Sequence, residues 1–282
     1  MAGAPGTIDD AKRLWDQRGY QEPGLSNAKQ CESIAKWLLD NNPPQDQLFE
    51  ILTLLAASNN FLGMVVDDTA AKLNYFTFAS SYGEKILSQL FHVTVTSSTD
   101  TDGLARRLKG SLNQSQLQQV AMSSLLSGAS WLGWAGAKAD MNGLFKLQTV
   151  HAYVNFVNAL GFASIYYYTC PALNGVIDCQ LPAQFGGNKN RALATFQPLV
   201  QLTQATNLSC SINGMISYYY INTLFDLGQT DNSRKVANDY LSNNDFYPRD
   251  LVPENLYYRN QIELSLRAPA RSLFAGLPTG KS

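Results

Sequence analysis

Helical periodicity is clearest in residues 27–55, which read NAKQCESIAKWLLDNNPPQDQLFEILTLL. Apolar residues recur there at spacings of three and four, which places them on one face of a helix. The first such stripe is Cys31, Ile34, Ala35 and Leu38, and the second is Leu48, Ile51, Leu52 and Leu55. The two stripes are separated by residues 41–44, Asn-Asn-Pro-Pro. Proline lacks a backbone N–H and disfavours helical angles at the residue before it, so the first helix is expected to end there. The stretch therefore predicts two consecutive amphipathic helices.

The rest of the chain extends this pattern with two exceptions. Further long stripes begin at Leu117 and Val150, and Ser81 with Glu84 matches a capping box that starts a helix. Residues 91–96 alternate apolar and polar side chains, which is typical of a short strand. Residues 169–187 contain three glycines and two prolines and predict a long loop. We therefore expect a mainly α protein with at most a short β-hairpin or strand.

Turn-forming residues along the chain indicate two helical lobes between two terminal arms. Residues 1–25 hold one short helix between Gly- and Pro-containing flanks and are expected to form an N-terminal arm. The polar turn at residues 97–103 separates an N-terminal helical lobe, 26–98, from a C-terminal helical lobe, 99–267. Residues 268–282 are expected to form a C-terminal tail.

The composition favours contacts with other macromolecules. Charged residues make up only 15% of the chain, against roughly 25% in typical soluble domains, and Asn and Gln together supply about one residue in seven. A surface of neutral polar groups loses its water more easily than one of lysines and glutamates, which suits repeated protein contacts. The net charge of −1 excludes a strongly basic footprint over the whole chain.

The sequence contains no readable catalytic or metal-binding constellation. The four cysteines form no C-x-x-C pair and the two histidines lie far from them, so we expect neither a metal nor a cofactor. Free thiols are expected, with a Cys170–Cys179 disulfide as the alternative in an oxidising compartment. Residues 275–282 fail as a phosphate-binding loop, because Ala275 replaces its first glycine and no helix follows. Asp67 and Asp68 lack the facing carboxylate of a magnesium site and are expected to be a solvated helix end.

Localisation is expected to be cytoplasmic, or in the virion if the protein is viral. Residues 1–8 show no basic region followed by an apolar core, so no signal peptide is expected. The most apolar stretches, 120–139 and 150–170, are interrupted by serines or by His151 and asparagines. Both are therefore interpreted as buried helices, and no membrane insertion is expected.

Nucleic-acid binding is the binding hypothesis that the largest number of residues supports. Arg106, Arg107 and Lys109 form a compact basic cluster, and Lys189 and Arg191 follow a Gly-Gly pair. Arg259 lies in a C-terminal region rich in tyrosine and arginine. Arginine pairs with phosphate and aromatic rings stack on unpaired bases, so the three groups would form a single-strand groove if they met in one cleft.

These features together resemble viral coat and nucleocapsid subunits, as a likeness of class and not of motif. The shared features are arms at both ends, two helical halves, neutral polar surfaces and no catalytic site. The resemblance implies a self-associating structural subunit, not an enzyme, whose partners are its own copies and single-stranded RNA. The sequence pI near 6.1 argues against dense RNA packing. The alternatives are a helical adaptor or secretion-system scaffold binding proteins through residues 169–187, and an enzyme whose site the sequence does not reveal.

Overall fold

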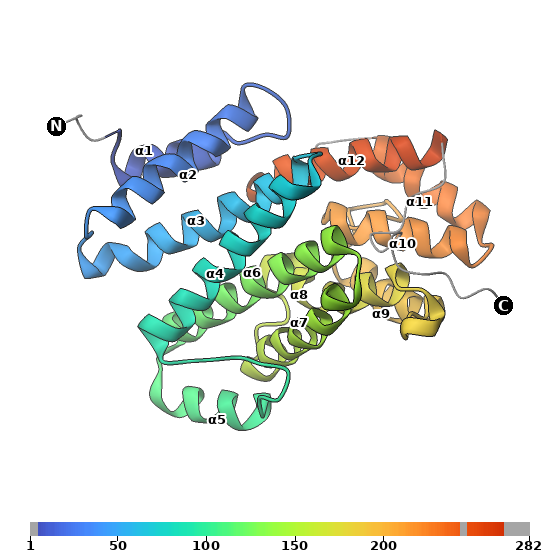
Figure 1. Cartoon of the computed structure of the whole chain (residues 1–282). Coiled ribbons are helices and arrows are strands. Elements are labelled where there is room, and N and C mark those ends of the chain that lie inside the picture. Colours follow the sequence, from blue (N-terminus) through green and yellow to red (C-terminus); the bar gives the residue numbers. More distant parts are fainter. Residues whose placement is uncertain (1–4, 243–246, 268–282) are drawn as a thin grey trace. The chain divides into compact units, whose positions relative to one another are not determined.

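The computed structural model describes residues 5–242 and 247–267, which form twelve α-helices and two short 3-10 helices (Figure 1). The expected mainly α fold is confirmed. No strand occurs within these described ranges, where the β-structure is one isolated antiparallel bridge between Gln204 and Ser211.

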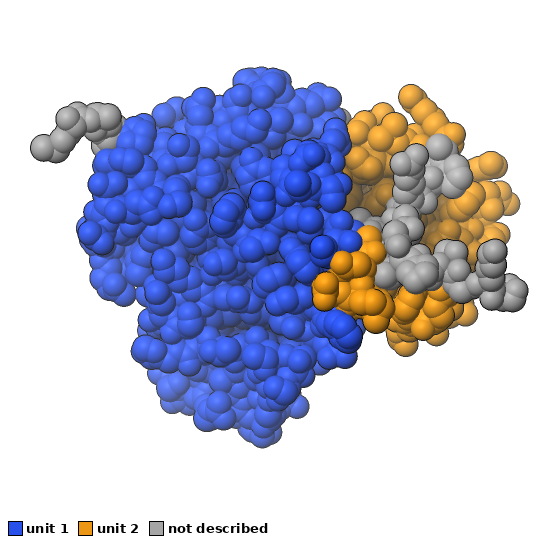
Figure 2. Space-filling model, in the orientation of Figure 1, with its two compact units in different colours: residues 1–138, 145–162 blue, residues 139–144, 163–282 orange. Residues whose placement is uncertain are grey.

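The chain forms two compact units, coloured separately in Figure 2. Unit 1 comprises Met1–Lys138 and Phe145–Phe162, and unit 2 comprises Ala139–Leu144 and Ala163–Ser282. The turn at residues 97–103, expected to separate two lobes, lies inside unit 1. The physical reason is that α6 (Gln114–Lys138), which follows the turn, packs along α4 (Thr69–Phe91), which precedes it.

Unit 1 is built from α1 to α6 and most of α7. The helices besides α4 and α6 are α1 (Ile8–Asp16), α2 (Gly24–Asp40), α3 (Gln45–Val65), α5 (Thr101–Ser111) and α7 (Met141–Leu160). The two helices predicted from residues 27–55 are α2 and α3, which end and begin on either side of residues 41–44. Their stripes are largely buried, with Cys31, Ala35, Ile51 and Leu55 fully inaccessible.

The N-terminal segment is not a free arm over its described part. Helix α1 packs on α2 and α3, and Ala11 and Leu14 are buried in one apolar cluster with Cys31 and Ile34. A capping box at Thr7 and Asp10 starts α1, so the segment carries its own helix signal as well as an apolar face. Residues 1–4 and the expected tail 268–282 lie outside the described residues.

Two local predictions around α4 are wrong. The helix begins at Thr69, where the Asp68 carboxylate caps it by accepting the Ala71 N–H at 2.7 Å, so Ser81 and Glu84 lie in its middle. Residues 91–96 are not a strand. Val93 and Val95 are buried while Thr94 and Thr96 are exposed, as the alternation indicated, but no second segment of the described chain pairs with them.

Small residues let α4 approach both α3 and α6. A Cβ atom added at Gly63 of α3 would lie 2.9 Å from the Phe76 ring of α4, and one at Gly133 of α6 would lie 2.5 Å from the same ring. At the next contact, a Cβ at Gly83 of α4 would lie 2.3 Å from Ser127 Oγ of α6. Phe76 thus occupies the space that two glycines leave, and the three helices pack as one layer of close contacts.

Unit 2 is organised around α10 (Gly214–Asp226), which contacts α8 (Ile165–Gln180), α9 (Lys189–Leu202), α11 (Thr230–Ser242) and α12 (Val252–Arg267). The 3-10 helices are η1 (Ala183–Phe185) and η2 (Arg249–Leu251). Ile221 and Leu224 of α10 join Val236, Tyr240 and Ile262 in the apolar core. The core of unit 2 therefore draws on helices far apart in the sequence.

The long loop predicted at residues 169–187 is wrong, because most of it is α8. Tyr166, Tyr167 and Tyr168 have left-handed backbone angles, with φ of 48°, 52° and 62°, so regular helix follows them. Pro171 then falls in the first regular turn, where the missing N–H costs nothing. The Asn213 amide donates to Thr169 Oγ1 at 2.8 Å and to the Tyr167 carbonyl at 3.2 Å, which fixes this entry to the helix.

One helix within the described residues has the length and composition of a membrane span. Helix α3 has a mean hydropathy of 1.5 over its most apolar window, and 56% of that window is buried inside unit 1. Core helices of folded units pass the same test, so the finding is weak evidence for a membrane. The expectation of no membrane insertion stays a prediction.

Replacing Gly133 by alanine should destabilise unit 1. Although alanine favours a helix, its Cβ would overlap the enclosed Phe76 ring, so we expect Gly133→Ala to lower the free energy of unfolding by about 1–3 kcal/mol. Gly110→Ala in α5 is the control, because a Cβ there meets nothing within 4 Å and should stabilise by about 0.5–1 kcal/mol. Urea denaturation measures both. Equal stabilisation by the two variants would contradict the packing described.

Candidate nucleic-acid interface

Three of the predicted nucleic-acid residues lie on the exposed side of α5. Leu104, Ala105 and Leu108 are the buried face of this helix. Arg106, Arg107 and Lys109 are exposed because they occupy the other positions of the helical turn. The Asp100 side chain starts the helix by accepting the Gly103 N–H at 3.0 Å. The three basic residues therefore lie on the exposed side of a single helix, and their role in binding stays a prediction.

The two arginines of α5 have no ion pair with a described carboxylate. Asp102, four residues before Arg106, does not approach within the 4.0 Å of an ion pair. Lys109 has no ion pair with a described carboxylate either, and its Nζ lies near Gly161, beyond the C-terminal end of α7. All three cations of the cluster are therefore unpaired within the described residues.

Lys189 and Arg259 are occupied by partners inside unit 2. Lys189 Nζ donates to the Cys179 carbonyl and pairs with the Asp226 carboxylate. The Arg259 guanidinium donates to the Leu241 carbonyl at 2.6 Å, near the C-terminal end of α11, and pairs with Glu263 at 3.4 Å. Both cations therefore join helices of their own unit.

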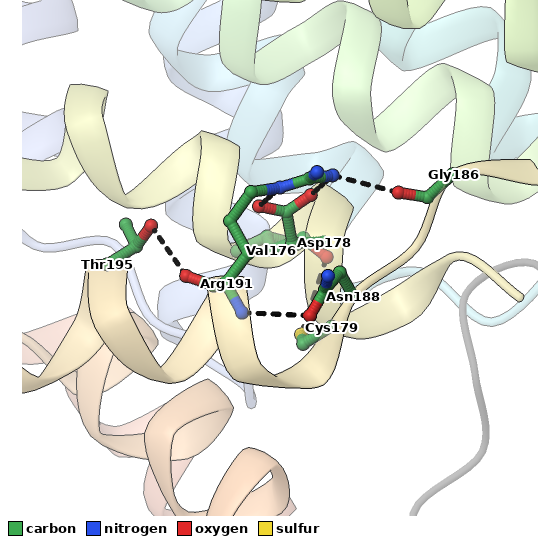
Figure 3. Close-up of polar contacts among 7 residues, drawn as sticks. All are labelled: Val176, Asp178, Cys179, Gly186, Asn188, Arg191 and Thr195. Carbon is green, nitrogen blue, oxygen red and sulfur yellow. Dashed lines mark hydrogen bonds and ion pairs between the residues drawn. The ribbon is translucent and has the colours of Figure 1, made fainter. Parts of the chain in front are cut away.

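Arg191 holds the buried carboxylate of Asp178 (Figure 3). Its Nε donates to Asp178 Oδ2 at 2.7 Å and its second nitrogen contacts Oδ1, while the same nitrogen donates to the Gly186 carbonyl at 2.8 Å. The Asn188 N–H donates to the Asp178 carbonyl at 2.9 Å. The hydrogen bond to Asp178 is also the main reason that the pKa of Arg191 is raised. Arg191 thus ties the η1 segment to α8 and α9.

The structure accordingly separates the six predicted residues into two groups. Arg106, Arg107 and Lys109 lie together on unit 1, and Lys189, Arg191 and Arg259 are held by carboxylates or carbonyls of unit 2. Their meeting in one groove stays a prediction. Exposed partners in ion pairs contribute little stability, but they compete with any phosphate for the cation.

Sequence reasoning missed a polar cavity in unit 1. Its volume is about 560 Å³, and it lies between the C-terminal half of α4, residues 93–97 and one face of α7. Helix α4 contributes Ser81, Glu84, Lys85 and Ser88, and α7 contributes Lys146, Thr149 and Tyr153. The first set has the i, i+3, i+4, i+7 spacing of one helix face, a signal present in the sequence but interpreted there as the start of a helix.

A charged network forms the floor of this cavity. Glu84 Oε1 accepts a hydrogen bond from Trp131 Nε1 of α6 at 2.7 Å and another from the Tyr153 hydroxyl of α7 at 3.2 Å. Lys146 Nζ lies 3.6 Å from the centre of the Trp131 ring, an attractive cation–π distance. Three helices, α4, α6 and α7, are therefore joined at one place.

Two half-exposed phenylalanines lie on the helices that line the cavity. Phe78 of α4 is 52% exposed and precedes Ser81 by three residues, and Phe145 of α7 is 63% exposed and precedes Thr149 by four. Neither ring lines the cavity itself, although each lies about one helical turn from a residue that does. Large exposed aromatic rings are the side chains on which unpaired bases stack.

The thiols are poor nucleophiles at neutral pH. All four cysteines are free and buried, and burial raises the pKa of Cys31, Cys170 and Cys210 to about 12 and that of Cys179 to about 11. The thiolate, not the thiol, is the reactive form. Within the described residues no three His, Cys, Asp or Glu side chains cluster as metal ligands would.

The described residues form a helical protein with a basic surface on α5 and a polar cavity in unit 1. The sequence matches no protein-family model. A search of curated proteins finds no match either.

Removing Arg191 should destabilise unit 2. Arg191→Ala leaves the buried Asp178 carboxylate without its donors, so we expect the free energy of unfolding to fall by about 2 kcal/mol. Arg234→Ala is the matched control, because Arg234 is exposed on α11 and should change stability by less than about 0.5 kcal/mol. Urea denaturation decides. If Arg191→Ala were as stable as the control, the residue would be free for a ligand after all.

Proposed function

We propose that this chain is a self-associating structural subunit, coat- or nucleocapsid-like, that binds single-stranded nucleic acid through unit 1. The observation that carries the proposal is the state of the cations. Arg106 and Arg107 are exposed without a carboxylate partner, whereas Lys189, Arg191 and Arg259 are neutralised within unit 2. A free guanidinium pair on one helix face is suited to successive phosphates of a strand.

Single strands are favoured over duplexes because unit 1 also offers aromatic rings. Phe78 and Phe145 are more than half exposed, which costs free energy in water and is relieved when a base stacks on the ring. Duplex bases are already stacked and present only their edges. Arginines that pair with phosphates, together with phenylalanines that stack on bases, would bind RNA without a strong preference for sequence.

Self-association is supported by surface chemistry in both units. Besides the two phenylalanines, Leu202, Phe225, Leu264 and Leu266 of unit 2 are 47–61% exposed. Only 15% of residues are charged, so little repulsion opposes contact between copies. Apolar side chains surrounded by neutral polar groups are typical of protein contact surfaces.

The adaptor alternative loses the feature on which it rested. Most of residues 169–187, expected to be the binding loop, belongs to α8, and eight of its residues between Cys170 and Cys179 are buried. A segment whose side chains are buried has little surface for a partner. No specific observation favours the adaptor over the subunit.

Removing the free arginines should weaken RNA binding. We expect the double variant Arg106→Ala/Arg107→Ala to bind a 20-nucleotide oligouridine about tenfold less tightly near 0.1 M salt, because two charged contacts to phosphate are lost. The slope of log affinity against log salt should become shallower by about 1.4, at about 0.7 per phosphate contact. Filter retention at several salt concentrations measures both quantities.

The matched control is Arg234→Ala/Arg249→Ala. Both arginines are exposed on unit 2, so replacing them removes the same total charge from another surface. The control should retain the affinity and the slope of the unchanged protein. Equal losses in both variants would show only an effect of net charge, and no loss in the first would refute the interface on α5.

Assembly should be visible directly. We expect concentrated full-length protein to form discrete oligomers or filaments by light scattering and electron microscopy, with larger particles when RNA is added. Phe145→Ser should reduce the assembled fraction or RNA binding if this ring is buried in a contact, whereas Gln148→Ser, an exposed position one turn on, should not. A monomer at all concentrations, with and without RNA, would contradict the subunit role.

A further inference from the structure

The carboxylate of Glu84 faces the unit 1 cavity with one oxygen already fixed. Trp131 and Tyr153 both donate to Oε1, and no described residue donates to Oε2. Burial and the neighbouring Glu84 raise the pKa of Tyr153, so its hydroxyl remains a donor at neutral pH. The indole N–H of Trp131 is also a donor only. Glu84 is thereby oriented to accept a hydrogen bond from a ligand through Oε2.

Two ammonium groups line the same cavity without a carboxylate partner. Lys85 neighbours Glu84 on α4, and Lys146 lies across from it on α7 with its Nζ over the Trp131 ring. Neither forms an ion pair with a described residue, in contrast to Lys189 and Arg191 of unit 2. The cavity therefore offers two positive charges and one anchored negative charge to the same ligand.

The remaining wall supplies hydroxyl and backbone groups. Residues 93–97 line the cavity with Thr94, Thr96 and Ser97, and the backbone of Thr94 makes no hydrogen bond to described residues. The volume of about 560 Å³ lies within the range of roughly 300–1,000 Å³ typical of small-molecule sites. It is large enough for one base, one sugar and one phosphate.

We infer that this cavity binds one nucleotide, with Lys85 and Lys146 on its phosphate and Glu84 on the amino group of its base. A wholly anionic ligand would be repelled by Glu84, and a simple cation by the lysines, so a ligand with a phosphate and separate hydrogen-bond donors fits both. Cytosine presents an amino donor where uracil presents a carbonyl acceptor, and carboxylates accept from the cytosine amino group. The inference that this nucleotide belongs to a bound RNA strand rests on the proposed function.

The test compares two nucleotides of equal size on the full-length protein. Titration calorimetry with cytidine and uridine 5′-monophosphates should show about tenfold tighter binding of the cytidine compound. Cytidine and inorganic phosphate should each bind much more weakly than the nucleotide, because each lacks half of the contacts. Equal affinities for the two nucleotides, or no binding of either at millimolar concentration, would overturn the inference.

Glu84→Gln tests the base contact without removing the floor of the cavity. The amide oxygen still accepts from Trp131 and Tyr153, and the amide nitrogen replaces Oε2 by a donor. The preference for cytidine monophosphate should therefore disappear or reverse toward uridine monophosphate. An unchanged preference with unchanged unfolding would show that Glu84 does not touch the base.

Lys85→Gln and Lys146→Gln test the phosphate contact. Each should weaken binding of both nucleotides about tenfold while leaving that of cytidine unchanged, because only a charged contact to phosphate is lost. Lys72→Gln is the matched control, since it lies on the same helix α4 but outside the cavity. Equal effects of all three variants would overturn the assignment.

Competition identifies the source of the nucleotide. If a 12-nucleotide oligocytidine displaces cytidine monophosphate and Lys85→Gln/Lys146→Gln weakens its binding, the cavity holds a nucleotide of the strand. If the mononucleotide binds but RNA does not, the cavity inference stands for a free nucleotide and the proposed function fails. If RNA binding depends on Arg106 and Arg107 alone and no mononucleotide binds, the proposed function stands and the cavity inference fails.

Discussion

The enclosure of the Phe76 ring between Gly63 and Gly133 is the contact on which unit 1 depends. It sets the distance of α4 from both α3 and α6, because no larger residue fits at either glycine. The same close approach brings Trp131 of α6 within hydrogen-bonding distance of Glu84 on α4. Packing between small residues thus positions the polar floor of the cavity, and the binding chemistry proposed for unit 1 follows from it.

Both units contain paired and unpaired cations. In unit 2, Asp178, Asp226 and Glu263 neutralise cations that hold adjacent helices and turns together, while Arg234 and Arg249 have no ion pair with a described residue. In unit 1, Lys12 and Lys36 are paired, whereas Arg106, Arg107, Lys85 and Lys146 are not. What distinguishes unit 1 is grouping, because Arg106 and Arg107 share helix α5 and Lys85 and Lys146 line one cavity. The proposed nucleic-acid binding rests on this grouping of positive charge.

Much of the fold followed from local spacing. The stripes in residues 27–55 predicted α2 and α3, and the proline pair placed the break between them, because these signals act within a few residues. The errors arose where one pattern is compatible with two structures. Ser81 with Glu84 matches a helix start, yet the Asp68 cap begins α4 earlier. Residues 169–180 contain Pro171 and Gly175, yet a left-handed tyrosine turn places the proline where a helix tolerates it.

The sequence by itself determined the helical class, the scarcity of charge and the basic cluster of α5, since composition and short-range periodicity suffice for these. Only the tertiary structure decided which cations are free, because Arg191 and Lys189 gain their partners Asp178 and Asp226 through folding. It also decided that Glu84, Trp131, Lys146 and Tyr153 meet. Those residues come from three helices, and contacts between distant segments depend on packing, which no local pattern encodes.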